Sequence, residues 1–226
     1  MAAAVRVRGP GVTALTLAGP QTAPGELAAA VALARRLGVR HLIRETDPLV
    51  LPDFRDNTPR RCYACKKAVI EQARDLAAVL GIDEVWDGTN LDDLADFRPG
   101  LQAARELGVR SPLLDVGLGK AGIRALSREL NLTWDRPPQS CLATRFPYYT
   151  TLTLEALARV GQGETWLRRR GFSRVRLRVQ GDTARLELPW EEWPKFLRPG
   201  IRGAFVAVLS SLGWQGVQLG VAGGGS

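Results

Sequence analysis

The sequence predicts an α/β fold, a doubly wound and mainly parallel sheet followed by a small α+β domain. In the first two thirds of the chain, short apolar runs of strand length alternate with helical stretches, which is the pattern of βαβ units. Beyond the proline-rich segment Trp134–Tyr149, two runs in which polar and apolar residues alternate are separated only by a short turn, which is the pattern of a β-hairpin. We therefore expect two domains, residues 1–149 and residues 150–226.

The first domain is expected to alternate strands with helices. Gly38, Gly81 and Gly108 each follow a helical stretch, where glycine commonly ends a helix. The expected strands are Val12–Leu17, Val39–Glu45, Ile82–Trp86 and the strand-like run Ser111–Gly117; the expected helices are Glu26–Leu37, Pro59–Leu80, Pro99–Leu107 and Gly119–Leu130.

The second domain is expected to begin with a long helix, Thr153–Arg170, which has threonine as its N-cap and Gly171 as its C-cap. A hairpin follows, because the runs Arg174–Val179 and Ala184–Leu188 alternate in polarity and are separated by a QGDT turn. The remaining expected elements are helices over 190–197 and 201–212 and a last strand over 215–221.

The composition predicts a soluble globular protein, because 45% of the residues are hydrophobic and 24% are charged. No apolar run approaches the roughly 20 residues of a membrane span, and the N-terminus lacks the apolar core of a signal peptide. We therefore expect a cytoplasmic protein without membrane contact. The net charge of +8 fits a polyanionic partner, either RNA or a phosphorylated small molecule, although an arginine-rich composition alone gives the same balance.

The three cysteines of the chain are Cys62, Cys65 and Cys141. Cys62 and Cys65 stand one helical turn apart within the run Arg60–Lys67, whose four cations favour thiolate over thiol. An odd number of cysteines without an export signal argues against disulfides. Zinc prefers four ligands and the chain offers only one histidine, His41. Three thiolates with one open position suit a four-iron four-sulfur cluster, and ordinary core packing is the alternative.

Two further groups of polar residues are candidates for ligand binding. The turn Asp87–Asn90 follows an expected strand, where ligands bind in open α/β sheets, and Asp92, Asp93 and Asp96 come next. These acids suit a metal ion or a ribose hydroxyl, and a plain polar turn is the alternative. On the hairpin, alternation puts Arg174, Arg176 and Arg178 on one face, either as solvated surface or as a phosphate grip.

Six stretches of the chain resemble the LarE family of ATP-dependent sulfur transferases, which belongs to the PP-loop ATP pyrophosphatase superfamily. They cover most of the chain in the family's order, and the RCYxCK and DGTN signals are specific. The stretches are RCYACKK at Arg61–Lys67, DGTNLDDLADFRPG at Asp87–Gly100, ELGVRSPL at Glu106–Leu113, GLGKAGIRALSRELNL at Gly117–Leu132, SCLATRFPY at Ser140–Tyr148 and VRLRVQGDTARLEL at Val175–Leu188.

The resemblance implies thiolation of a pyridinium dicarboxylate mononucleotide, a step in the biosynthesis of a nickel-pincer cofactor. ATP with Mg²⁺ adenylates a substrate carboxylate, pyrophosphate leaves, and a sulfur nucleophile then displaces AMP. Some family members give up the sulfur of one cysteine, which matches Cys141. Others hold a four-iron four-sulfur cluster on three cysteines, which matches Cys62, Cys65 and Cys141, and this chain has all three.

The resemblance also assigns roles to the remaining candidate residues. It implies that residues 1–149 form a PP-loop-like ATP pyrophosphatase domain and that residues 150–226 form a domain for substrate binding or oligomerisation. The protein is expected to be a homo-oligomer. The expected nucleotide-binding residues are Asp87, Gly88, Asn90 and Asp93; the residues expected to bind the substrate and its phosphate are Arg145, Glu164, Arg176 and Arg178.

The chain departs from the family pattern at both ends. In the family pattern, an SGGVDS-type loop that cradles pyrophosphate precedes the strand that is expected here from Val12, and this sequence does not contain that loop. Near the other end, the family's LDLxGYRxG is replaced by LGVAGGGS. In addition, Gln180 stands where histidine is common. These departures predict an N-terminally truncated or catalytically impaired homologue as one alternative. A PP-loop enzyme that thiolates tRNA is the other, although the chain has none of the additional CxxC pairs that would favour binding of nucleic acid.

Overall fold

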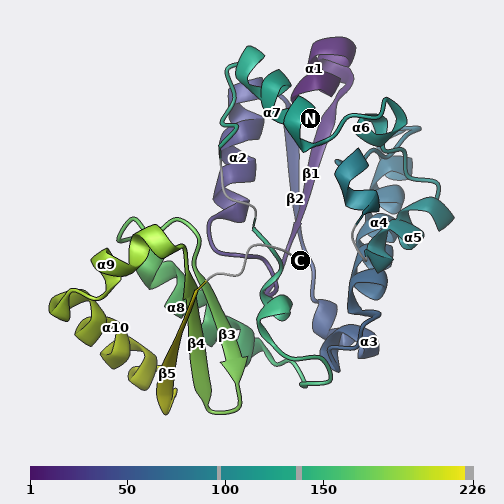
Figure 1. The fold of residues 1–226 in the computed structure, drawn as a ribbon. Helices are drawn as coiled ribbons and strands as arrows, with labels where there is room; N and C mark the ends of the chain where they lie inside the picture. Colours follow the sequence, from purple (N-terminus) through teal and green to yellow (C-terminus); the bar gives the residue numbers. More distant parts are fainter. Residues whose placement is uncertain (96–97, 136–138, 222–226) are drawn as a thin grey trace. The chain divides into compact units, whose positions relative to one another are not determined.

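The computed structural model describes residues 1–95, 98–135 and 139–221. Contacts within the chain divide it into two compact units, which Figure 1 shows as ribbons. Unit 1 comprises Met1–Gly19 and Leu27–Arg136, and unit 2 comprises Pro20–Glu26 and Pro137–Ser226. The expected boundary after Tyr149 therefore falls inside unit 2, and a short N-terminal segment also belongs to unit 2.

Unit 1 contains helices and two strands that largely follow the expected order. Its elements are α1 (Ala2–Arg8), η1 (Gly9–Gly11), β1 (Thr13–Ala18), α2 (Glu26–Leu37), β2 (Arg40–Glu45), η2 (Pro48–Val50), α3 (Pro52–Arg55), α4 (Arg61–Val79), η3 (Leu91–Leu94), α5 (Pro99–Glu106), α6 (Pro112–Asp115) and α7 (Lys120–Glu129).

Strands β1 and β2 pair in parallel, in a register that runs from Thr13 opposite Arg40 to Ala18 opposite Glu45. Parallel neighbours need a crossover connection, and the alanine-rich helix α2 provides it. The two strands are adjacent in Figure 1. This pair confirms the prediction of a mixed α/β fold with parallel strands, whereas the wider doubly wound sheet stays a prediction.

The expected strand Ile82–Trp86 is reduced to a single parallel bridge between Trp86 and Arg110. Each of the two segments that meet at this bridge follows a glycine at the end of a helix. Gly81 (φ 64°) ends α4 and Gly108 (φ 67°) ends α5, both in the left-handed region that glycine adopts without steric cost. Because the two segments meet only near Trp86, they form no longer ladder within the described residues.

Two local expectations in unit 1 were wrong. The run Ser111–Gly117, expected as a strand, contains the short helix α6, because Pro112 occupies its first turn, where proline's fixed φ fits and its missing N–H costs nothing. The helix that carries Cys62 and Cys65 was expected to start at Pro59, but α4 begins at Arg61, after a turn at Pro59 and Arg60.

Unit 2 combines several helices with a three-stranded sheet. Its elements are η4 (Leu142–Arg145), α8 (Leu154–Arg168), β3 (Arg176–Gln180), β4 (Thr183–Leu188), η5 (Trp190–Glu192), α9 (Trp193–Phe196), α10 (Pro199–Ser211) and β5 (Gly216–Val221). The sheet order is β3–β4–β5, with β3 and β4 antiparallel as expected and β5 parallel to β4. Of the helices that the structure describes, none is long and apolar enough to cross a membrane.

Helices α8 and α10 pack against the sheet of unit 2 (Figure 1), and buried apolar residues of these helices and strands form its hydrophobic core. Along β3 and β4, buried and half-buried residues alternate, which puts Leu177 and Leu186 into the core and the arginines on the other face. Gly163 of α8 allows close packing, because a Cβ there would lie 2.8 Å from Leu177 and 3.1 Å from Leu209.

Candidate functional site

The turn that begins at Asp87 is organised by the carboxylate of that residue. Asp87 Oδ1 accepts hydrogen bonds from the Thr89 backbone N–H (3.1 Å) and Ser111 Oγ (2.8 Å). Its Oδ2 accepts from Lys66 Nζ (2.9 Å) and Thr89 Oγ1 (2.9 Å). Burial raises the pKa of Asp87, but the hydrogen bonds from Lys66 and Ser111 outweigh it and hold the pKa below its ordinary value. About four acceptor positions of a carboxylate are thus filled by the chain itself.

Asn90 and Asp93 form a capping box at the start of η3. The backbone N–H and the side-chain amide of Asn90 donate to Asp93 Oδ2 (3.1 and 2.7 Å), and Arg98 Nη1 lies 3.0 Å from Asp93 Oδ1. Both residues are buried. Gly88 differs, because a Cβ at this position would meet nothing within 4 Å. Of the expected nucleotide-binding residues, three therefore shape the turn and Gly88 leaves its backbone open to close approach; Asp96 lies outside the described residues.

Cys62 and Cys65 lie one turn apart in the first half of α4, with Cys62 exposed and Cys65 half-buried. The next residue, Lys66, reaches the carboxylate of Asp87, so this part of the cysteine helix contacts the Asp87 turn. Helix α5 begins against the same part of α4, because a Cβ at Gly100 would lie 3.3 Å from Lys66 Cβ and 3.4 Å from the carbonyl oxygen of Cys62. Unit 1 thus brings two of the three cysteines and the expected nucleotide turn together.

In unit 2, Glu164 is fully buried and binds two arginines. Its Oε1 accepts from Arg145 Nε (2.6 Å) and from the backbone N–H of Leu177 (3.0 Å). Its Oε2 accepts from Arg168 Nη2 (2.8 Å) and Arg145 Nη2 (3.3 Å). Arg145 is itself only 2% exposed. One carboxylate therefore faces two guanidiniums, and the buried cluster carries a surplus of positive charge.

Arg176 and Arg178 project from the face of the hairpin opposite the core, and their partners differ. Arg178 donates to Glu187 Oε2 (3.1 Å) and to the carbonyl oxygen of Thr144 (3.1 Å). Arg176 is half-buried and makes no hydrogen bond or ion pair with a residue in the described ranges. Burial lowers the pKa of Arg176, and the neighbouring charges of Arg145 and Arg178 lower that pKa further. An anion placed here would relieve this repulsion.

Thr144 connects this arginine cluster to the third cysteine. Its hydroxyl donates to the carbonyl oxygen of Cys141 (2.7 Å) and accepts from Arg145 Nη1 (2.8 Å). Its own carbonyl oxygen accepts from Arg178, as described above. The short 3₁₀ turn η4 thus places Cys141 beside Arg145 and Arg178, and unit 2 brings together the five residues that the sequence assigned to substrate and sulfur chemistry there.

Several residues of these networks, among them Lys66, Thr144 and Arg168, had no role assigned from the sequence. In the sequence, Lys66 stands out only as one of four cations near the cysteines, and Thr144 only as part of the stretch SCLATRFPY. Arg168 stands four positions after Glu164 on α8, and this Glu-to-Arg spacing of one helical turn is a signal that could have identified it.

Cys62 and Cys65 belong to unit 1, and Cys141 belongs to unit 2. Within either unit, the residues that the structure describes include no group of three histidine, cysteine or acidic side chains arranged to hold a metal ion. The three-cysteine site therefore stays a prediction.

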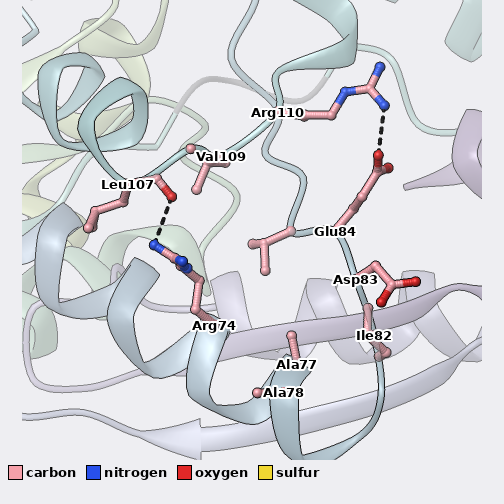
Figure 2. A pocket seen from close by; sticks show the side chains of 11 residues that line it. Arg74, Ala77, Ala78, Ile82, Asp83, Glu84, Leu107, Val109 and Arg110 are labelled. Carbon is pink, nitrogen blue, oxygen red and sulfur yellow. Dashed lines mark hydrogen bonds and ion pairs between the residues drawn. The ribbon is translucent and has the colours of Figure 1, made fainter.

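Two cavities lie away from the predicted residues. The first, about 450 Å³, is lined by the end of α4 and the segments 82–85 and 107–110. Figure 2 shows that its arginines already have partners, since Arg74 reaches the carbonyl oxygen of Leu107 and Arg110 pairs with Glu84. The second, about 740 Å³, lies in unit 2 beside α8 and α10. Neither cavity is lined by a predicted site residue, so we assign the chemistry to the networks above.

Comparison with known proteins identifies relatives of the chain but no family model. No protein-family model matches the chain. An uncharacterized protein of Synechocystis sp. is 40% identical over 214 residues, which are 94% of this chain and 80% of that protein. The pyridinium-3,5-bisthiocarboxylic acid mononucleotide synthase of Lactiplantibacillus plantarum is 38% identical over 195 residues, 86% of this chain and 70% of the synthase. An uncharacterized protein of Methanocaldococcus jannaschii is 36% identical over 132 residues, 58% of this chain and 52% of that protein.

The match to the synthase is long enough to define a family. The chain belongs to the family of the pyridinium-3,5-bisthiocarboxylic acid mononucleotide synthase, the LarE family. The resemblance found in the sequence motifs is thereby confirmed at the level of the family.

Proposed function

We propose that this protein is an ATP-dependent sulfur transferase that thiolates the carboxylates of a pyridinium dicarboxylate mononucleotide. The family supports this reaction, and one observation in the structure carries it. Arg176, a half-buried guanidinium without a hydrogen-bonding partner in the described part of the chain, lies near the buried Arg145 and the network that holds Cys141. A phosphorylated substrate matches the surplus of positive charge, and Cys141 supplies sulfur chemistry in the same unit.

In this proposal, each group of residues has a separate task. Arg176 and Arg178 bind the phosphate of the mononucleotide, because a guanidinium presents paired N–H donors that match phosphate oxygens. Glu164 keeps Arg145 in place behind them. The Asp87 turn, with the open backbone at Gly88, binds ATP. The parallel β1–β2 pair and the Trp86–Arg110 bridge support the proposed doubly wound PP-loop fold.

The reaction then follows two displacements. A carboxylate oxygen of the substrate attacks the α-phosphorus of ATP, which breaks the bond to pyrophosphate and gives an acyl-adenylate. A sulfur nucleophile attacks the acyl carbon, and AMP leaves with the bonding electrons of the carbon–oxygen bond. The positive cluster of unit 2 favours both steps by holding the negatively charged substrate in a fixed orientation.

We further propose that Cys62, Cys65 and Cys141 hold a four-iron four-sulfur cluster. Cys62 and Cys65 fit such a group, since thiols one turn apart on α4 can bind one centre. When bound, a cluster with three protein ligands would supply an exogenous sulfide at its open position. The protein's own part is to present the three thiolates and to orient the substrate.

Loss of pyrophosphate from ATP is the first test of the proposed function. The chain, reconstituted anaerobically with iron and sulfide, is expected to release pyrophosphate from ATP only when pyridinium-3,5-dicarboxylic acid mononucleotide is present. Cys141→Ser is expected to keep this release and to abolish the thiocarboxylate product seen by mass spectrometry, because adenylation precedes sulfur delivery. No release from either protein would contradict the proposal, and release that requires tRNA instead would favour RNA thiolation.

Reconstitution also tests the cluster separately from the reaction. The wild-type chain is expected to become brown, with broad visible absorbance and about four iron atoms per chain, as a cluster of this type requires. Cys65→Ser is expected to lose most of this absorbance, whereas Ser111→Ala, which alters the Asp87 turn without removing a thiol, is expected to keep it. A colourless wild-type protein would return the cysteines to ordinary packing roles.

A further inference from the structure

We infer that Arg168 is a positioning residue that connects the loop of Cys141 to the phosphate-binding strand. Three contacts from one nitrogen carry this inference. Arg168 Nη2 donates to Glu164 Oε2 (2.8 Å), to Gln139 Oε1 (3.1 Å) and to the carbonyl oxygen of Val175 (3.1 Å). The inference rests on the proposed phosphate-binding role of Arg176.

The contact with Gln139 controls the approach of the chain to the cysteine. Gln139 stands two residues before Cys141, and between them Ser140 accepts a hydrogen bond from Arg145 Nη1 (2.6 Å). Because Arg145 and Arg168 bind the same carboxylate, both ends of this short segment are fixed to one buried acid. Movement of the loop therefore requires a break in that shared network.

The contacts on the other side fix the backbone around Arg176. The carbonyl group of Val175 accepts from Arg168, and the N–H of Leu177 donates to Glu164. The residues that flank Arg176 are thus both held by a pair of side chains on α8. Since Val175 and Leu177 point into the core, the side chain between them is directed to the opposite face of the strand.

The guanidinium of Arg168 is also an incompletely compensated charge. Its Nε and Nη1 atoms are buried and have no hydrogen-bonding partner among the residues that the structure describes. Buried N–H groups without partners lower the stability of the folded protein. The stability of the core alone therefore does not explain an arginine at position 168. A role in aligning Cys141 with Arg176 accounts for its presence there.

Phosphate binding measured by phosphorus NMR is the first test, with inorganic phosphate as the probe and the full chain as the protein. Arg168→Met is expected to weaken phosphate binding about tenfold, the order of one charge-assisted hydrogen bond lost at Arg176. Arg168→Lys is expected to restore binding to within about threefold, since its ammonium group again presents several donors near one point. Arg169→Met serves as the matched control, because Arg169 is the exposed C-cap residue directly after Arg168, and this variant is expected to bind as the wild type does.

Hydrogen–deuterium exchange tests the connection itself. Arg168→Met is expected to accelerate amide exchange in peptides that cover 139–146 and 175–180 together. Gln139→Met, which leaves the contacts with Glu164 and Val175 intact, is expected to accelerate exchange only in 139–146. This second variant carries the test if Arg168→Met does not fold.

The outcomes separate this inference from the proposed function. No phosphate binding by the wild type would overturn the phosphate site and the inference with it. Wild-type binding that persists unchanged in Arg168→Met, or exchange in 139–146 that does not respond to Gln139→Met, would overturn the inference alone.

Discussion

Replacing Glu164 with alanine is expected to lower the free energy of unfolding by about 3–5 kcal/mol, the range measured when one partner of a buried ion pair is removed. Glu164 is fully buried, and it accepts hydrogen bonds from Arg145, Arg168 and the backbone of Leu177. Without the carboxylate, two guanidiniums stay inside unit 2 with no counter-charge from this position. The loss arises from that uncompensated charge rather than from the small cavity.

Urea denaturation followed by tryptophan fluorescence measures this effect, because Trp193 and Trp214 are buried in unit 2. Glu191→Ala is the matched control, since Glu191 is exposed, and it is expected to change the free energy by less than about 0.5 kcal/mol. An equally small change for Glu164→Ala would show that water or a rearranged side chain compensates the arginines. The buried network would then not be the organising feature of unit 2.

Replacing Arg176 with alanine is expected to weaken binding of the mononucleotide by about 1.5–3 kcal/mol, as for a lost hydrogen bond to a charged group, which corresponds to roughly 10-fold to 150-fold. The same substitution is expected to leave the stability of the protein unchanged or slightly higher. Arg176 makes no hydrogen bond within the described part of the chain, and it is repelled by Arg145 and Arg178. A change that lowers affinity without lowering stability distinguishes a binding residue from a structural one.

Isothermal titration calorimetry with pyridinium-3,5-dicarboxylic acid mononucleotide measures the affinity, and thermal melting measures the stability. Arg174→Ala is the control, because Arg174 lies two residues earlier on the same run and is exposed. It is expected to bind the mononucleotide as the wild type does. If Arg176→Ala and Arg174→Ala bind equally well, the arginine row is solvated surface.

Much of the local structure could be predicted from the sequence. The helix ends at Gly81 and Gly108 followed from the conformational freedom of glycine, and the hairpin of unit 2 followed from its alternating residues and its turn. The expected strand over 111–117 failed, because the preference of Pro112 for the first turn of a helix outweighed the apolar run after it. The expected strand over 82–86 depended on a neighbour that pairs with it only at Trp86.

The candidate site shows the same division between local and distant information. By itself, the sequence determined that Cys62 and Cys65 share a helix and that Arg176 and Arg178 share a strand face, because both follow from the periodicity of a single element. Only the tertiary structure decided that Lys66 and Ser111 donate hydrogen bonds to the carboxylate of Asp87. It also decided that Arg178 has hydrogen-bonding partners, while Arg176 has none among the residues that the structure describes. The physical reason is distance along the chain. Such pairs join residues whose approach depends on how whole elements pack, and no local pattern encodes that.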